Sequence, residues 1–181
     1  ENQLHRLVSS GIDQPVGIKN PTGGSIAVTL NSVYAAQNPQ IFMYHNYQVA
    51  TRGNEYAHVV LRGRVDHYGN DIPNYHYETV MQVVEGYSAA NGELKNPAVV
   101  IDSNHSNSKK QFRQQIRIVE EVLQNRLYDK DFKRIVKGFM IESFLVEGNQ
   151  KHDIVFGKSI TDPCLGWEDT ERLILDIAEK A

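Results

Sequence analysis

The sequence has 181 residues, of which 40% are hydrophobic and 23% charged, and its formal net charge at pH 7 is −3. This composition is ordinary for a soluble globular protein with one core, and it gives no support for a nucleic-acid or membrane partner. No apolar run approaches the ~20 residues of a membrane-spanning helix. The single cysteine, Cys164, excludes an intramolecular disulfide framework and predicts a reducing, cytoplasmic location.

Four short apolar runs divide the chain, and each is rich in Val, Ile, Leu or Phe. Because stretches of helical character separate these runs, we expect them to form buried parallel strands. The four expected strands occupy residues 15–19, 58–62, 98–102 and 138–143.

The stretches between the runs predict helices. The clearest covers residues 109–127, where apolar residues recur at offsets of four, seven and eleven from Phe112. The β-branched and aromatic residues between positions 39 and 52 instead predict an inserted β-hairpin. The other expected helices occupy residues 1–10, 24–37, 75–90 and 168–179.

The remaining stretches predict connections. Residues 64–74 predict a polar loop, residues 129–133 a charged linker, and residues 147–163 a long loop with a short strand at 154–156. The order is therefore βα repeated four times, with one hairpin inserted. This order predicts an α/β fold that amounts to half of a (β/α)8 barrel, since a complete barrel needs about 250 residues.

Four side chains with useful chemistry lie at or just past the ends of the expected strands. Lys19 ends the first, Arg62 ends the second, His105 follows the third, and Glu142 lies near the end of the fourth. A parallel β/α barrel gathers the carboxyl ends of its strands at one face, where its active site forms. Two cations, an imidazole and a carboxylate are therefore expected to converge, as an anionic substrate and a metal ion require.

The two cations suit anion binding. Lys19 precedes a Thr-Gly-Gly turn into a helix, and a strand end beside a helix amino terminus favours phosphate. Arg62 leaves a buried strand, where a guanidinium suits bidentate capture of a phosphate or carboxylate. The alternatives are a solvated lysine at a loop edge and a structural ion pair of the arginine.

The other three candidates suit a divalent metal. His105 follows an unusually polar strand exit and offers a neutral imidazole, although a lone histidine is more often a surface or hydrogen-bonded one. Glu142 stands in an apolar context and needs a metal or a cation as partner. Asp162, in the loop after the last strand, offers a second carboxylate, and the three together form an oxygen and nitrogen donor set.

Five ordered motifs carry a resemblance that covers essentially the whole chain. They are VGIKNPTGGSI, HVVLRG, IDSNHSNSKKQ, GFMIESFLVEGNQ and GKSITDPCLGWEDTE. In this order they resemble the C-terminal half of class I 3-deoxy-D-arabino-heptulosonate 7-phosphate (DAHP) synthases. The resemblance implies a (β/α)8 TIM-barrel fold, with residues 1–181 covering roughly strands 5–8 as a half-barrel with an inserted β-hairpin.

The resemblance also implies a function, the condensation of phosphoenolpyruvate with erythrose 4-phosphate to DAHP and phosphate, the first step of the shikimate pathway. By motif, Lys19 and Arg62 are similar to residues that bind phosphoenolpyruvate, and Lys19 and His105 to catalytic residues. His105, Glu142 and Asp162 resemble three of four ligands to a divalent metal ion, Mn²⁺ or similar. The implied partners are small phosphorylated substrates, and open sheet edges lead us to expect a homo-oligomer.

Some features depart from the family pattern. The fourth metal ligand, a cysteine, and a Lys-Pro-Arg-Thr motif for erythrose 4-phosphate belong to the family's N-terminal half, which this sequence does not contain. Ser103 and Asn104 stand where better-known members carry an aromatic residue and a serine, and a longer loop follows Arg62. The alternative function is therefore a catalytically silent half-barrel lobe that acts in assembly or complementation.

Overall fold

The computed structural model describes residues 3–90, 92–152 and 154–180. Its centre is a four-stranded sheet in which each strand pairs in parallel with the next one along the chain. The sheet therefore has the βα connectivity expected from the sequence. In sheet order, the strands are β1 (Gly17–Lys19), β4 (His58–Leu61), β7 (Val99–Asp102) and β8 (Val136–Met140).

Each predicted helix has a counterpart in the structure, and two short helices occur that the sequence did not predict. The longer helices are α1 (Gln3–Ser9), α2 (Ile26–Gln37), α3 (Tyr77–Ala89), α5 (Gln114–Tyr128) and α7 (Trp167–Lys180), and the short ones are α4 (His105–Ser108) and α6 (Lys130–Ile135). Helix α5 begins later than expected because Lys109 and Lys110 adopt left-handed backbone angles, with φ of 53° and 58°, which end α4. Among the described residues, no helix is long and apolar enough to cross a membrane.

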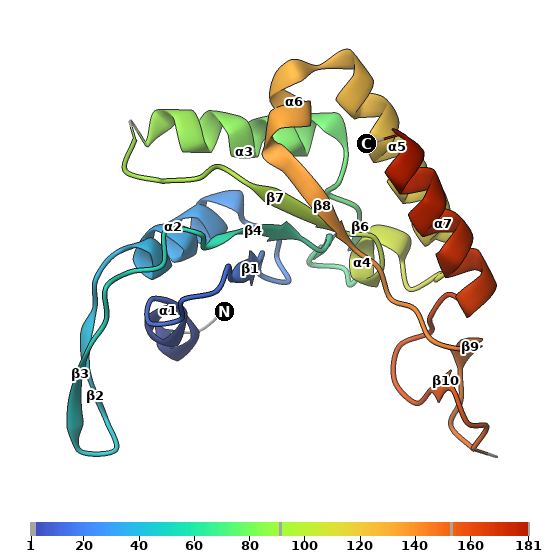
Figure 1. Ribbon diagram of the computed structural model, residues 1–181, viewed down its shortest axis with the longest axis horizontal. Coiled ribbons are helices and arrows are strands. Elements are labelled where there is room, and N and C mark those ends of the chain that lie inside the picture. The colour runs from blue at the N-terminus through green and yellow to red at the C-terminus, as the bar shows by residue number, and fades with distance from the viewer. Residues whose placement is uncertain (1–2, 91, 153, 181) are drawn as a thin grey trace.

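Most of the core lies between the sheet and the helices on one of its faces. Val59 and Ile101 of the strands pack with Val33 of α2, Val83 of α3 and Ile118 of α5, and all five are fully buried. Burying one such side chain stabilises the fold by about 1.5–3 kcal/mol. The result is an arch, with α3 and α6 above the sheet and α5 and α7 at one side (Figure 1).

Two smaller elements descend from the ends of the arch (Figure 1). One is the antiparallel hairpin of β2 (Ile41–Tyr44) and β3 (Tyr47–Ala50), which confirms the predicted insertion. Its turn residues His45 and Asn46 both have positive φ, as a tight type I′ turn requires. The other is the pair β9 (Val146–Asn149) and β10 (Lys158–Ser159).

The predicted linker at residues 129–133 is wrong, because most of it belongs to α6. The carboxylate of Asp129 accepts a hydrogen bond from the backbone N–H of Phe132 at 2.8 Å and caps the helix. The fully buried ring of Phe132 then anchors α6 to the core. The charged residues 129–133 therefore form the amino-terminal part of a helix that Phe132 anchors to the core.

The strand expected at residues 154–156 is also wrong, since the pairing lies at β10. The Gln150 side chain accepts from the Val155 N–H at 2.6 Å and donates to the Val155 carbonyl at 2.9 Å, so an amide takes the place of a strand partner. The predicted polar loop at 64–74 contains a small antiparallel pair, β5 (Arg64–Val65) and β6 (Asp71–Ile72). The fourth main strand begins two residues earlier than expected.

Candidate functional site

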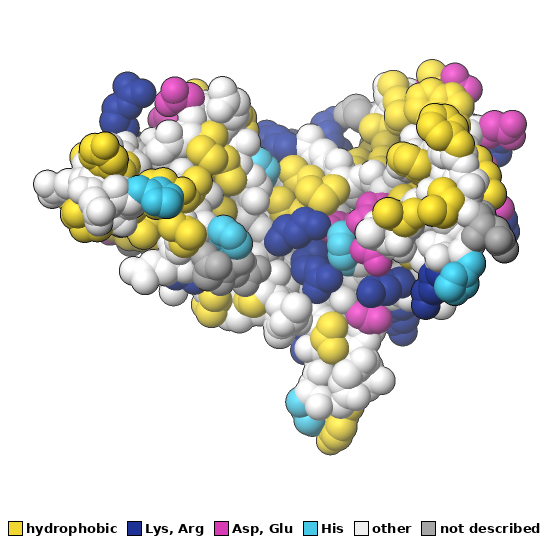
Figure 2. Space-filling model, turned by 90° about the horizontal axis from the view of Figure 1, so that it is seen from below, with side chains coloured by type: hydrophobic (Ala, Val, Ile, Leu, Met, Phe, Trp, Pro, Cys, Tyr) yellow, Lys and Arg dark blue, Asp and Glu magenta, His cyan; other side chains and the backbone are white. Residues whose placement is uncertain are grey.

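The predicted site residues lie at the carboxyl edge of the parallel sheet. Lys19 is the last residue of β1, Arg62 follows β4, His105 begins α4 just after β7, and Glu142 follows β8. Asp162 reaches the same edge from the loop between β10 and α7, where its Oδ2 atom lies 3.8 Å from the Nε2 atom of His105. Seen from below the arch, Lys and Arg side chains gather beside a histidine and acidic side chains in its hollow (Figure 2).

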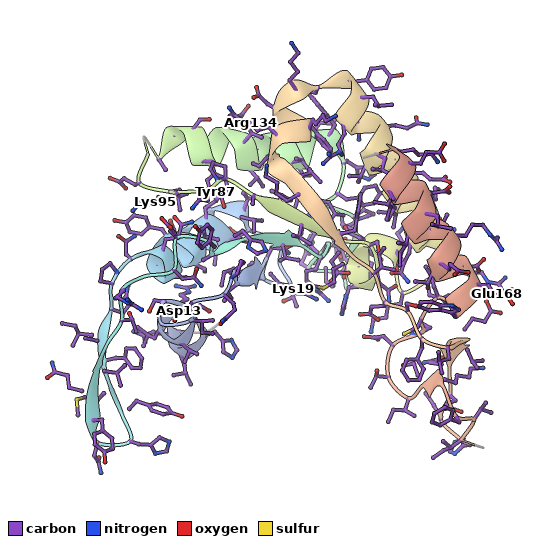
Figure 3. All side chains as sticks on the ribbon, viewed as in Figure 1. Asp13, Lys19, Tyr87, Lys95, Arg134 and Glu168 are labelled. Carbon is purple, nitrogen blue, oxygen red and sulfur yellow. The ribbon has the colours of Figure 1, made fainter. Side chains whose placement is uncertain are left out.

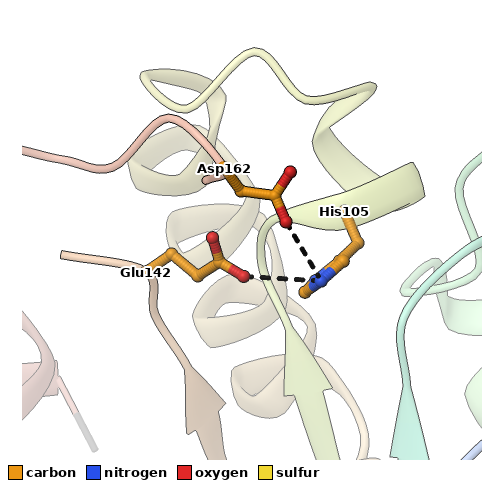
Figure 4. A group of neighbouring side chains, drawn as sticks. All are labelled: His105, Glu142 and Asp162. Carbon is orange, nitrogen blue, oxygen red and sulfur yellow. Dashed lines mark ion pairs between the residues drawn. The ribbon is translucent and has the colours of Figure 1, made fainter. Parts of the chain in front are cut away.

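His105, Glu142 and Asp162 form a compact group with the chemistry of a metal site (Figure 4). The Nε2 atom of His105 lies 3.4 Å from Oε1 of Glu142, and the three ligand atoms all lie within 4.8 Å of one another. All three side chains are partly buried, with 20%, 23% and 38% of their surface exposed. One imidazole and two carboxylates suit a divalent cation such as Mn²⁺, so the residues present fit the group that the resemblance implies.

Asp102, at the end of β7, holds this group from behind. Its carboxylate is fully buried, and its Oδ2 atom lies 2.8 Å from the Nζ of Lys19 and 2.8 Å from the Nδ1 of His105. Burial raises the pKa of Asp102, but the contacts with His105 and Lys19 together lower it by more, so that the pKa lies below its ordinary value. Nδ1 of His105 therefore faces the carboxylate of Asp102, while Nε2 faces Glu142 and Asp162. This is the usual orientation of a metal-binding histidine.

Sequence reasoning did not include Asp102 among the site residues. The available signal was a carboxylate that ends an apolar strand three residues before the histidine. A second omission is Lys110, whose Nζ lies 3.8 Å from Oδ1 of Asp162 and adds a third cation to the site. In Figure 3, Lys19 lies beneath the sheet near the middle of the arch, on the side where the hollow opens.

Arg62 is held by a chain of buried amides. Its backbone N–H donates to Oδ1 of Asn20 at 2.9 Å, and Nδ2 of Asn74 donates to the same atom at 3.0 Å. Asn74 in turn accepts from the N–H of Gly63 at 2.7 Å and donates its own N–H to Asn107 at 2.8 Å. The guanidinium Nη1 atom is buried and has no hydrogen-bond partner among the described residues.

Glu142 is held by Gln115, a fully buried residue of α5. The Gln115 amide accepts from the Glu142 N–H at 2.9 Å and from the Ser103 hydroxyl at 3.0 Å, and it donates to the Glu142 carbonyl at 3.0 Å. This clamp fixes the backbone of Glu142 directly beyond the end of β8. The ligand group is therefore supported by the neighbouring helix as well as by the sheet.

The parallel sheet carries cations and a His-Glu-Asp group at its carboxyl edge, which is where enzymes of the (β/α)-barrel class have their active sites. The model of the DAHP synthetase I family matches residues 1–174. The chain belongs to this family.

Known proteins similar to the chain carry the same enzyme name. The chain is 39% identical over 190 residues to the Trp-sensitive phospho-2-dehydro-3-deoxyheptonate aldolase of Enterobacter agglomerans. This match covers 99% of the chain and 51% of the relative. It is 38% identical over 187 residues to the Phe-sensitive enzyme of Escherichia coli K12, covering 98% of this chain and 50% of the relative.

A solved structure shares the fold. The phospho-2-dehydro-3-deoxyheptonate aldolase of Francisella tularensis SCHU S4 superposes with a TM-score of 0.85 at 32% identity, over 99% of this chain and 52% of that one. The chain thus spans about half the length of the relatives that it matches. The mixed α/β fold with a parallel sheet is the one expected for the family.

Proposed function

We propose that residues 1–181 form the C-terminal half, roughly strands 5–8, of a (β/α)8 barrel that condenses phosphoenolpyruvate with erythrose 4-phosphate to DAHP and phosphate. The observation that carries this proposal is the His105, Glu142 and Asp162 group beside Lys19, in a chain of the DAHP synthetase I family. The relatives named above are phospho-2-dehydro-3-deoxyheptonate aldolases, the family resemblance implies the condensation, and the side chains at the strand exits suit it.

Lys19 and Arg62 are the proposed phosphoenolpyruvate ligands. The Lys19 side chain is 35% exposed and its Nζ lies 2.8 Å from the buried carboxylate of Asp102, and an ammonium group has three hydrogens to donate, so Lys19 can also bind an anionic ligand. The buried Nη1 atom of Arg62 has no acceptor in the described part of the chain, and a buried donor without an acceptor is costly. A carboxylate or phosphate at this edge would satisfy both groups with charge-assisted hydrogen bonds.

His105, Glu142 and Asp162 are the proposed metal ligands from this chain, and Mn²⁺ or a similar ion is the proposed cofactor. When bound, such an ion supplies Lewis-acid polarisation of the aldehyde of erythrose 4-phosphate. The contact of His105 with Asp102 holds the imidazole so that Nε2 faces the other two ligands.

The remaining chemistry falls to the residues that bind and orient the substrate. Lys19 and Arg62 hold the anionic groups of phosphoenolpyruvate while its C3 atom bonds to the aldehyde carbon. The aldehyde oxygen takes up a proton and becomes a hydroxyl, water adds at C2 and loses its protons, and the bond between C2 and the phosphate oxygen breaks to leave a ketone and release phosphate. Asp102 links Lys19 to His105, so the two proposed catalytic residues keep a common position relative to the reacting atoms.

A catalytically silent lobe is the second candidate function. Strands β1 and β8 form the two edges of the main sheet, and each pairs on one side only within the part of the chain that the structure describes. Open edges of this kind favour pairing with another chain. This observation also supports the proposal of a homo-oligomer, and a cytoplasmic location stays a prediction from the single cysteine.

Titration of Mn²⁺ into the 181-residue chain, followed by calorimetry, tests the ligand set. We expect binding by the parent and its loss in the double variant Glu142→Gln/Asp162→Asn. The matched control is Glu55→Gln/Asp13→Asn, which removes two exposed acids outside the site and should bind Mn²⁺ like the parent. Equal binding by both double variants would reject the metal site.

An assay of DAHP formation separates the two candidate functions. We expect no detectable product from the 181-residue chain alone, and product when the N-terminal half of the Escherichia coli Phe-sensitive enzyme is added. Lys19→Met should abolish this product, whereas Lys95→Met, which lies before β7 and away from Lys19 (Figure 3), should not. A stable complex without product would favour the silent lobe, and rapid turnover by the chain alone would contradict the half-barrel assignment.

A further inference from the structure

Asn104 contacts all three segments that carry the proposed metal ligands. It directly precedes His105, and its Nδ2 atom donates to Oε2 of Glu142 at 2.9 Å and to the carbonyl of Pro163 at 3.3 Å. Pro163 directly follows Asp162. The Asn104 side chain therefore joins the turn after β7, the end of β8 and the loop before α7 through one amide, and the residue is only 1% exposed.

Neighbouring hydrogen bonds fix the direction of this amide. Its Oδ1 atom accepts from the hydroxyl of Ser108 at 2.7 Å, so the NH₂ group must face Glu142 and Pro163. The backbone N–H of Asn104 donates to Oδ1 of Asp102 at 3.0 Å, which holds the residue from the other side. An amide with both ends occupied and little exposure has no freedom to rotate.

The contact uses one carboxylate oxygen of Glu142 and leaves the other. Oε2 accepts from Asn104, whereas Oε1 lies 3.4 Å from Nε2 of His105, on the side of the ligand group. Gln115 fixes the backbone of the same residue. Glu142 is thus restrained at both ends, with a single oxygen directed to the position that an ion would take.

We infer that Asn104 is a positioning residue that restricts Glu142 to ligation through one oxygen and sets the ion preference of the site. The inference rests on the proposed metal site. Ca²⁺ takes six to eight oxygen ligands and often uses both oxygens of a carboxylate, whereas smaller ions accept fewer ligands. Occupying Oε2 with an amide donor therefore disfavours Ca²⁺ relative to Mn²⁺.

The experiment is calorimetric titration of the 181-residue chain with Mn²⁺ and, separately, with Ca²⁺. In Asn104→Ala, we expect Mn²⁺ affinity to fall by roughly 10–100-fold, as for other residues that support a metal ligand. Ca²⁺ affinity should fall less or rise, because the second carboxylate oxygen of Glu142 becomes available as a ligand. The ratio of the Mn²⁺ affinity to the Ca²⁺ affinity should therefore decrease. Asn104→Ser, which retains a hydroxyl for Ser108 but is too short to reach Glu142, should show the same change if the alanine variant does not fold.

The matched control is Asn54→Ala. Asn54 is a similarly buried amide, 3% exposed, that donates to the carbonyls of Ser9 and Gln14 away from the site. We expect it to lower stability and leave the affinities for both ions unchanged.

The possible failures are distinguishable. If the parent chain binds no Mn²⁺, the proposed metal site is wrong and the inference is wrong with it. If the parent binds Mn²⁺ and the Asn104 variants bind it equally well, the metal site stands and the inference alone is wrong. If the Asn104 variants lower the affinities for Mn²⁺ and Ca²⁺ by the same factor, or if Asn54→Ala changes these affinities in the same way, Asn104 has a general structural role and sets no ion preference.

Discussion

Replacing Gln115 by leucine separates support of the site from support of the fold. Gln115 is fully buried, and its amide makes three hydrogen bonds, two to the backbone of Glu142 and one to the Ser103 hydroxyl. Leucine has a similar volume and removes all three without leaving a large cavity. The change therefore isolates the amide.

The structure offers a matched residue at the opposite edge of the sheet. Gln37 of α2 is 7% exposed, and its amide donates to the carbonyls of Ala57 and Lys95, with a longer contact of 3.4 Å to that of Glu55, and accepts from the Lys95 N–H. Gln37→Leu therefore removes the same kind of interaction before the strands β4 and β7 begin. None of these partners belongs to the proposed site.

At about 1 kcal/mol for each net hydrogen bond, three lost bonds lower the free energy of unfolding by roughly 3 kcal/mol. For a domain of this size, about 2–4 °C is lost for each kcal/mol, so the melting temperature should fall by roughly 6–12 °C. We expect a loss of this kind in both variants, because both remove an amide that hydrogen-bonds backbone groups at buried and part-buried positions.

Only Gln115→Leu should weaken Mn²⁺ binding, because only this change frees the backbone of a proposed ligand. Urea or thermal unfolding measures the first effect, and Mn²⁺ titration at a temperature where both variants are folded measures the second. If both variants lose Mn²⁺ affinity equally, binding depends on global stability and the clamp has no local role. If neither loses stability, the three bonds are worth less than assumed.

Three further predictions follow from other parts of the structure. Burial raises the pKa of Tyr87 to about 12, so the free energy of unfolding should fall by about 2–3 kcal/mol as the pH rises from 10 to 12 and the phenol ionises more readily in the unfolded chain. In alkaline unfolding, Tyr87→Phe should abolish this fall, whereas Tyr128→Phe, at an 86% exposed position, should retain it. Gly63→Ala should destabilise the fold more than Gly69→Ala in urea unfolding, because both glycines have positive φ but only at Gly63 would a Cβ meet backbone, 2.6 Å from the N atom of Asn107; equal losses would mean that backbone strain alone acts. Light scattering should find the 181-residue chain self-associated through its open sheet edges, and a stable monomer would contradict that expectation.

The sequence by itself determined the main strands, the longer helices and the hairpin, because these depend on spacing between near neighbours. Apolar runs that end in polar residues identify buried parallel strands, and parallel strands share one carboxyl edge. The sequence alone therefore predicts that Lys19, Arg62, His105 and Glu142 lie at a common edge, as the structure shows. Their roles in binding and catalysis stay predictions.

Local patterns failed where a single side chain changed the backbone. Residues 129–133 have the composition of a charged linker, yet the cap by Asp129 and the burial of Phe132 make them part of α6. Residues 154–156 have the composition of a strand, yet Gln150 occupies the backbone groups of Val155 that a strand partner would need. Competition of this kind depends on geometry, which composition does not contain.

Only the tertiary structure decided which groups support the site. Asp102 lies 83 residues from Lys19 in the sequence, and the two meet because β1 and β7 both end at the same edge of one sheet. Gln115 and Asn104 likewise meet Glu142 across 27 and 38 residues. The sequence shows that such polar residues need partners if buried, but sheet register and helix packing choose the partner.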